Sequence, residues 1–257
     1  MATVLAALDN SFAANPVLVM ARALARVLGH RVEAIHVLGE GAGAAEGAAA
    51  AAGVPLRQSS GPVVQRLVEA GEAAGVDALV IGARGTGGSG HALGSTALAV
   101  VTSLRTPVVV VQPSAQVAAR LRAVLVPLDG TTSSTLIPRS IVELADHAEV
   151  EVTALHVNGV EQHDEHWTRE FLTRYCPFGI GKVRLERRSG RREEVIPVVA
   201  EELQSDLIVL GWAQQLSDGR APVVRAALER SKIPVMLIPV SLGGGDDERP
   251  SRRTAGR

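Results

Sequence analysis

Short apolar runs alternate along the chain with segments in which apolar residues recur at helical spacing. In the N-terminal part the predicted strands are residues 3–8, 32–38, 54–59, 78–81 and 108–111, of which 78–81 and 108–111 are continuous apolar runs. Such runs are typical of strands that are covered on both faces of a sheet. The helical spacing appears between them, at residues 16–28, 62–74 and 95–104. This alternation of strands and helices predicts a parallel α/β sheet.

Residues 39–53 leave two interpretations open. The segment is almost wholly Gly, Ala and Glu. Its alanines favour a helix, whereas the glycines between them weaken one. The sequence is therefore equally compatible with a helix and with a poorly ordered connection.

The same order of elements begins again at Ala123. AVLVPLDG repeats TVLAALDN, so that Asp129 takes the place of Asp9, and VTALHVNG repeats VEAIHVLG, so that His156 takes the place of His36. Later elements match in the same order, which indicates a tandem duplication. Right-handed crossovers turn each copy into a five-stranded parallel sheet with helices on both faces. We expect both histidines to pack inside, since no second metal ligand lies at a suitable spacing.

The two copies define the expected domains. Residues 1–118 form the first and residues 119–241 form the second, while residues 242–257 lack apolar periodicity and form a disordered tail. The chain has 257 residues, which is enough for two domains of ordinary size.

Composition narrows the function classes. The formal net charge is −1, and non-specific nucleic-acid binding would need a basic surplus. The single cysteine, Cys176, excludes an internal disulfide framework and fits a reducing cytoplasm. No apolar run is long enough to span a membrane. We therefore expect a cytoplasmic protein without a nucleic-acid or membrane partner.

A glycine-rich loop follows the strand at residues 78–81 and runs to Gly94, where Ser95 and Thr96 begin a helix. Glycines let the backbone approach a ligand closely, and the first N–H groups of a helix attract anions. The loop lies at the carboxyl end of a strand, where open α/β sheets bind ligands. It therefore suits a phosphate group, with a mobile surface loop as the alternative.

Taken together, these features resemble the universal stress protein family. The resemblance rests on Asp9 at a strand end, on the His36-Val37 pair, and on a Gly-x-x-Gly loop that runs into Gly-Ser-Thr. It covers residues 2–113 and 122–240. It implies two tandem domains with a Rossmann-like fold of the adenine nucleotide α-hydrolase type. It also implies that the last strands of the two domains pair within the chain, and it allows for a homodimer.

The resemblance further implies an ATP site in the first domain, with or without Mg²⁺. Asp9 would accept hydrogen bonds from adenosine beside Ala7 and Leu8, and Val37 would hold the adenine through its backbone. Without the repeat, Asp9 at a strand end is equally a helix cap or turn residue.

At the phosphate end, three glycines would let the loop close, two hydroxyl residues would donate to phosphate oxygens, and a cation would add positive charge. The glycines are Gly82, Gly85 and Gly94, the hydroxyl residues are Ser95 and Thr96, and the cation is Arg84 or His91. Gly85 and Gly94 are separated by eight residues, whereas binding members of the family usually have nine. A loop this rich in glycine either absorbs the one-residue difference or misplaces the phosphate donors.

The second domain departs further from the family pattern. Gly211 keeps the first loop glycine, but Gln214 stands in place of the second, and Pro222 stands where Ser95 begins the helix. Pro222 has no N–H donor, and Trp212 is bulky enough to occupy the pocket. We therefore expect ATP in the first domain only, with the second serving in packing or recognition.

Enzymatic alternatives have weaker support. Residues 85–90 match the G-x-G-x-x-G dinucleotide fingerprint, but they follow the fourth strand, and no acid lies about 20 residues further on. The loop has no lysine, which excludes a P-loop NTPase. Slow ATP hydrolysis would have to recruit His91 or Asp9 as a base. The sequence thus favours a nucleotide-binding module for a stress response or signalling.

A third hypothesis is a stress protein that acts on a partner without nucleotide. Residues 161–178 collect Trp167, Phe171, Tyr175 and Phe178 along one helical face. Such a stripe fits either burial in the core or recognition of a partner.

Overall fold

The computed structural model describes residues 1–11, 13–38, 43–85, 93–128, 150–158, 183–212 and 222–239. Several features predicted from the sequence lie outside these residues. They are His91, Asp129, Cys176, Gln214, the aromatic segment 161–178 and the tail 242–257.

The first half of the chain, which we define as β1 to β5, folds in the predicted order. Its elements are β1 (Thr3–Leu8), α1 (Ala14–Leu28), β2 (Arg31–Val37), α2 (Ala44–Ala52), β3 (Leu56–Ser59), α3 (Val63–Gly71), β4 (Val76–Gly82), α4 (Ser95–Ser103) and β5 (Val108–Val111). The second half is β6 to β10. Its described elements are β6 (Ala123–Leu128), β7 (Glu151–Asn158), β8 (Val183–Ser189), α7 (Arg192–Glu202), β9 (Leu207–Trp212), α8 (Pro222–Arg230) and β10 (Val235–Pro239).

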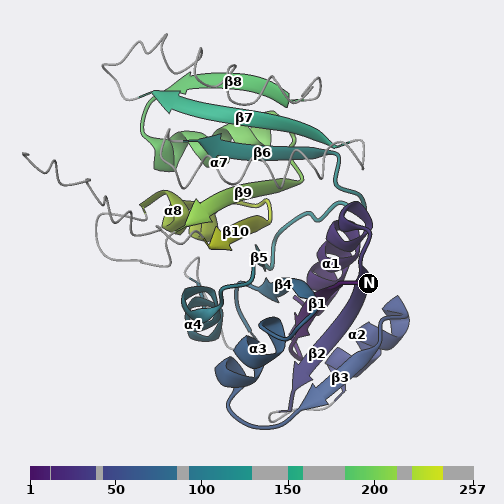
Figure 1. The fold of residues 1–257 in the computed structure, drawn as a ribbon. Helices are drawn as coiled ribbons and strands as arrows, with labels where there is room; N and C mark the ends of the chain where they lie inside the picture. Colours follow the sequence, from purple (N-terminus) through teal and green to yellow (C-terminus); the bar gives the residue numbers. More distant parts are fainter. Residues whose placement is uncertain are drawn as a thin grey trace, which may run out of the picture.

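All of the described strands belong to one ten-stranded sheet (Figure 1). Its order is β3-β2-β1-β4-β5-β10-β9-β6-β7-β8. The strand order of the second half is therefore the mirror image of that of the first half. Within each half, neighbouring strands are parallel. At the junction β5 and β10 are antiparallel, with Val110 opposite Val235 and Val108 opposite Leu237. The predicted α/β fold is confirmed.

The central strands are the most apolar because both faces of the sheet are covered there, whereas the edge strands β3 and β8 carry many polar residues. Every residue of β1 and β5 is buried. Side chains alternate between the faces, so Val109 and Val111 join the core beneath α1 and α2, whereas Val108 and Val110 join the core beneath α3, α4, α7 and α8.

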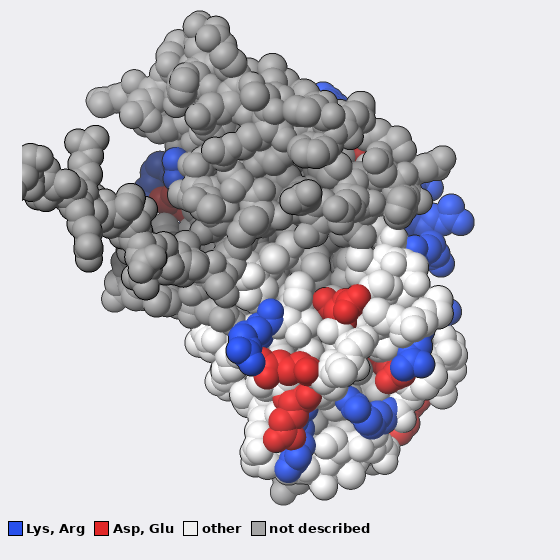
Figure 2. Space-filling view, in the orientation of Figure 1, with Lys and Arg blue, Asp and Glu red and all other residues white. Residues whose placement is uncertain are grey.

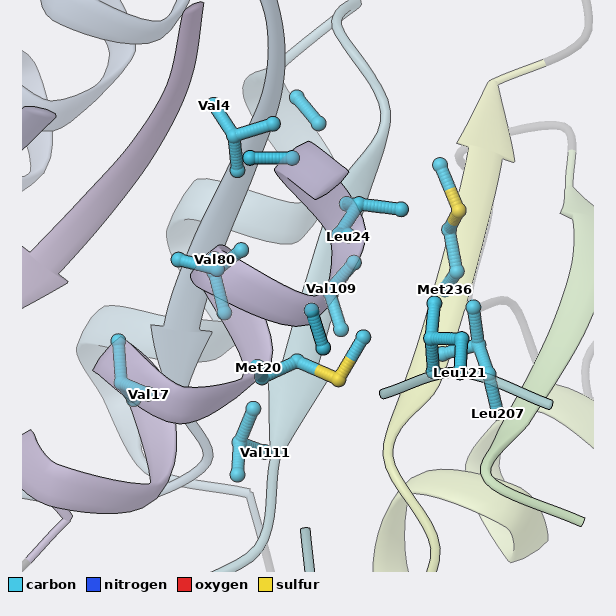
Figure 3. Close-up of a cluster of buried hydrophobic side chains, with 14 of the residues drawn as sticks. Val4, Val17, Met20, Leu24, Val80, Val109, Val111, Leu121, Leu207 and Met236 are labelled. Atoms are coloured by element: carbon cyan, nitrogen blue, oxygen red, sulfur yellow. The ribbon is translucent and has the colours of Figure 1, made fainter. Parts of the chain in front are cut away.

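Both cores continue from one half into the other. On the α1 face, Met20 and Val109 of the first half share a cluster with Leu207 and Met236 of the second (Figure 3). Leu121, which lies between the halves in the sequence, belongs to the same cluster. Burial of apolar surface therefore joins the two halves as well as stabilising each of them.

Helix α2 answers the open question over residues 39–53 for the part that the structure describes. The Ala45 N–H donates to Asn10 Oδ1 at 3.2 Å, which satisfies one of the first amides of the helix. Gly53 ends the helix with a φ of 62°, a left-handed conformation that glycine adopts without strain. The N-terminus of α2 is thus capped by a residue from outside the segment, whereas Gly53 within the segment ends the helix.

Acidic and basic side chains are mixed over the face of the first half that Figure 2 shows. Some of them pair on the surface, as Arg66 does with Glu69 at 2.7 Å. Within the part of the chain that the structure describes, no helix combines the length and apolar character needed to cross a membrane.

Candidate functional site

A cavity of about 480 Å³ opens at the carboxyl edge of the first half of the sheet. It lies among the ends of β1, β2 and β4 and the first turns of α1, α3 and α4, because in parallel βαβ units each helix starts where a strand ends. All ten residues assigned to the site from the sequence line this cavity; they are Ala7, Leu8, Asp9, Val37, Gly82, Arg84, Gly85, Gly94, Ser95 and Thr96.

Two buried histidines hold equivalent strand ends in the two halves. His36 Nδ1 lies 2.9 Å from the Leu8 carbonyl oxygen, and His156 Nδ1 lies 3.4 Å from the Leu128 carbonyl oxygen. Both side chains are buried, as the sequence predicts. Each ring fastens a strand to its neighbour, and in the first half this fixes the residue directly before Asp9.

The two carboxylate oxygens of Asp9 have different surroundings. Oδ1 accepts hydrogen bonds from the Ser11 N–H at 3.0 Å and from the Ser11 hydroxyl, which makes a turn before α1. Oδ2 faces Gly85, where a Cβ would lie only 2.9 Å away. Asp9 therefore serves as a turn residue through one oxygen and presents the other to the cavity beside the glycine loop.

The base of the loop is closed by its own backbone. The Gly94 N–H donates to the Ala83 carbonyl oxygen at 2.9 Å. A Cβ on Gly94 would lie 3.3 Å from the same oxygen, so a side chain there would push the two ends of the loop apart. Helix α4 starts at the next residue, which places its first turn at the cavity wall.

The first turn of α4 supplies amide donors. Ser95, Thr96 and Ala97 line the cavity, and no described side chain caps this helix. The first N–H groups of an α-helix lack intrahelical partners and carry the positive end of its dipole. The first turn of α4 has no acidic residue to compensate them. This wall of the cavity can therefore bind an anion.

Arg84 adds a cation to the same wall. Its side chain is half-buried, and Nη2 donates to Gln112 Oε1 at 3.5 Å. Its Nε is buried and has no hydrogen-bond partner among the described residues. Arg84 and Asp9 are the only charged residues among the described residues that line the cavity. A bound anion can satisfy the unpaired donor.

Sequence reasoning missed much of the apolar lining. Ala13, which directly precedes α1, Val17 of α1, and Val63 and Leu67 of α3 line the cavity. A signal was present, because the first turn of each helix in a parallel sheet lies at this edge. The arrangement can hold a flat apolar group between a carboxylate and a set of hydrogen-bond donors to an anion.

The corresponding positions in the second half carry different side chains. Pro222 is the first residue of α8, at the position of Ser95. Trp212 stands at the position of Ala83, is buried, and belongs to the core cluster that includes Val224 of α8. Ala83 itself does not line the first-half cavity, so Trp212 is better described as core than as an occupant of a pocket.

Comparisons with known proteins bear on the fold of this chain. Residues 39–112 match the model of the Universal stress protein family. A universal stress protein from Archaeoglobus fulgidus DSM 4304 superimposes with a TM-score of 0.70 at 18% identity, over 93% of this chain and 96% of that chain.

A functionally unknown protein from Pseudomonas aeruginosa PAO1 superimposes with a TM-score of 0.66 at 13% identity, over 93% of this chain and 92% of that chain. At these identities the structures establish the fold alone. No curated protein gave a significant match. The resemblance to the universal stress protein family that the sequence predicts is confirmed.

Proposed function

We propose that this protein is a universal stress protein that binds ATP or a related adenine nucleotide in its first half and acts as a stress-response or signalling module. One observation carries the proposal. The carboxylate of Asp9 and the amides that begin α4 line the same cavity, with the loop glycine Gly85 beside the carboxylate. A nucleotide needs this combination of an acceptor for its hydroxyl groups and donors for its phosphates.

The phosphates would lie against the first turn of α4. Ser95 and Thr96 would donate through backbone amides and hydroxyls, and Arg84 would donate through the unpaired Nε. Charge-assisted hydrogen bonds to phosphate oxygens are stronger than neutral ones. Gly85 leaves room for the ribose, because the space that its side chain would fill lies directly before Asp9 Oδ2.

The nucleoside would lie across the cavity. Asp9 Oδ2 would accept from ribose hydroxyls, and the backbone of Val37 would contact the adenine edge. The ring would pack against the apolar side chains of Val17 and Leu67, which line the same space. A cavity of about 480 Å³ is within the usual range for small-molecule sites.

Mg²⁺ would enter with the nucleotide rather than bind the protein first. Among the described lining residues Asp9 is the only acid, and one carboxylate does not make a magnesium site. We restrict the proposal to the first domain, residues 1–118, because Pro222 removes an amide donor at the matching position of the second, residues 119–241. We also expect the protein to act in the cytoplasm.

A thermal-shift and calorimetry series on the full chain tests the proposal. ATP with Mg²⁺ should raise the melting temperature, because a ligand that binds only the folded state stabilises it in proportion to the logarithm of its concentration over Kd. Gly85→Val, which would place a branched side chain against Asp9 Oδ2, should abolish the shift. The matched control is Gly47→Val, since a Cβ at residue 47 meets nothing within 4 Å.

Two results would contradict the proposal. One is calorimetry that records no heat with ATP, ADP or AMP at millimolar concentration. The other is a Gly85→Val variant that binds ATP as the wild type does. Chromatography of the nucleotide after long incubation separates binding from slow hydrolysis, and we expect ATP to be recovered intact.

A further inference from the structure

We propose that Gln112 transmits the state of the first-half cavity to the C-terminal end of α8 in the second half. The identity of the ligand at the cavity rests on the proposed function. The side-chain link is a separate feature that can be tested without nucleotide.

Gln112 is a buried polar residue directly after β5, with 4% of its surface exposed. Its Nε2 donates to the Leu228 carbonyl oxygen of α8, and its Oε1 accepts from Arg84 Nη2 at 3.5 Å. Rotating the amide by half a turn would place its NH₂ group against the guanidinium and its oxygen against the carbonyl. The two bonds therefore hold Gln112 in one orientation and depend on each other.

Of the three hydrogen-bonded residues, Arg84 is the one that a ligand can reach. It lines the cavity, and its buried Nε has no hydrogen-bond partner among the described residues. An anion in the cavity would draw the guanidinium toward itself, because charge-assisted hydrogen bonds are stronger than neutral ones. The bond to Gln112 is at the limit of hydrogen-bond length, so a small movement of Arg84 breaks it.

Leu228 is the one of the three residues that lies in a helix end able to respond. It lies in the last turn of α8, where carbonyl groups lack intrahelical partners. The amide of Gln112 satisfies its carbonyl oxygen. When Gln112 loses Arg84, its amide is no longer held in place, and the last turn of α8 loses its external support. This turn leads through a short connection into β10, the strand that pairs with β5 of the first half.

The link has no counterpart at the matching position of the second half. In the repeat, Pro239 takes the position of Gln112. Proline has no side-chain donor or acceptor, so the second half cannot make the reciprocal contact from that position. The second half therefore has no equivalent link at this position, and because coupling between two sites is reciprocal, a change at α8 would in turn affect the first-half cavity.

Hydrogen exchange of the full chain tests the link without any ligand. Arg84→Met and Gln112→Met should each speed exchange in the last turn of α8 by up to about tenfold, the effect of losing one hydrogen bond. The double variant should be no faster than Gln112→Met, because both act through one path. Gln65→Met is the matched control, since the Gln65 amide pairs with Glu69 on the surface of α3. Unchanged exchange in α8 of Arg84→Met, or additive effects, would overturn the proposal.

A nucleotide arm tests the regulatory role. ATP should alter exchange at the end of α8 in the wild type and not in Gln112→Met. Gln112→Met leaves Arg84 at the cavity, so it should still bind ATP in calorimetry, which separates loss of transmission from loss of binding. If ATP binds by calorimetry but α8 of the wild type does not respond, the transmission is refuted. If ATP does not bind, the proposed function fails, and the Arg84→Met result still decides whether the link exists.

Discussion

The two halves share a framework and differ in the residues that meet a ligand. In both, a buried histidine bonds the carbonyl at the end of the neighbouring strand, His36 to Leu8 and His156 to Leu128. At the strand and helix ends the halves diverge, with Ser95 replaced by Pro222. The framework depends on buried contacts that tolerate little change, whereas binding depends on a few edge positions that can change without unfolding the sheet.

The largest expected effect concerns the core that the halves share. Met236→Ala should lower the free energy of unfolding by about 2–5 kcal/mol, because it removes buried side-chain volume at the junction. Both halves should still unfold together. Urea denaturation curves recorded by circular dichroism, without and with ATP, check this. Two separate transitions would show that the halves are independent modules.

The next effect separates the two roles of Asp9. Asp9→Ala should weaken ATP binding by about 10- to 150-fold, since it removes a charged acceptor. Asp9→Asn keeps an oxygen for the Ser11 turn and should preserve stability while weakening binding. Asp77→Ala is the control, because Asp77 pairs with His30 at the other end of the sheet. Equal affinities of the wild type and Asp9→Ala in calorimetry would remove Asp9 from the site.

A third variant copies the second half into the first. Ser95→Pro should weaken ATP binding by about tenfold, because it removes one amide donor and one hydroxyl. It should leave the fold intact, since proline is accepted at the first position of a helix and Gly94 already has the extended backbone that precedes proline. Calorimetry and thermal melting measure the two quantities. Loss of stability without loss of affinity would contradict this interpretation of Pro222.

The smallest effect concerns the second histidine. Burial lowers the pKa of His156, and nearby Arg192 and Arg187 lower it further. The unfolded chain therefore binds the proton more readily than the folded one. The contribution to stability is complete above about pH 6.5 and decreases as the pH falls below that value. His156→Asn should flatten the dependence of unfolding free energy on pH below about 6.5. An unchanged slope would assign the dependence to other groups.

The sequence predicts the fold well because burial on both faces makes strands nearly continuous apolar runs. β5 illustrates this, since its four valines begin and end the strand as predicted. The residues of the proposed site follow from the family resemblance, and they line one cavity.

Contacts between distant parts of the chain were not predictable in the same way. Helix α2 depends on Asn10, whose oxygen caps it from 35 residues away. Gln112 follows the valine run as an ordinary polar residue, and its partner Leu228 lies 116 residues further on. Local periodicity carries no information about such pairs, because the folded sheet alone brings them together.

The antiparallel pairing of β5 with β10 reverses the polarity of the sheet at its centre. The carboxyl edges of the two halves consequently point toward opposite ends of the molecule, and the cavity opens at one of them. A macromolecule that docks on the matching edge of the second half would leave the cavity uncovered, so small-molecule exchange and docking could proceed together.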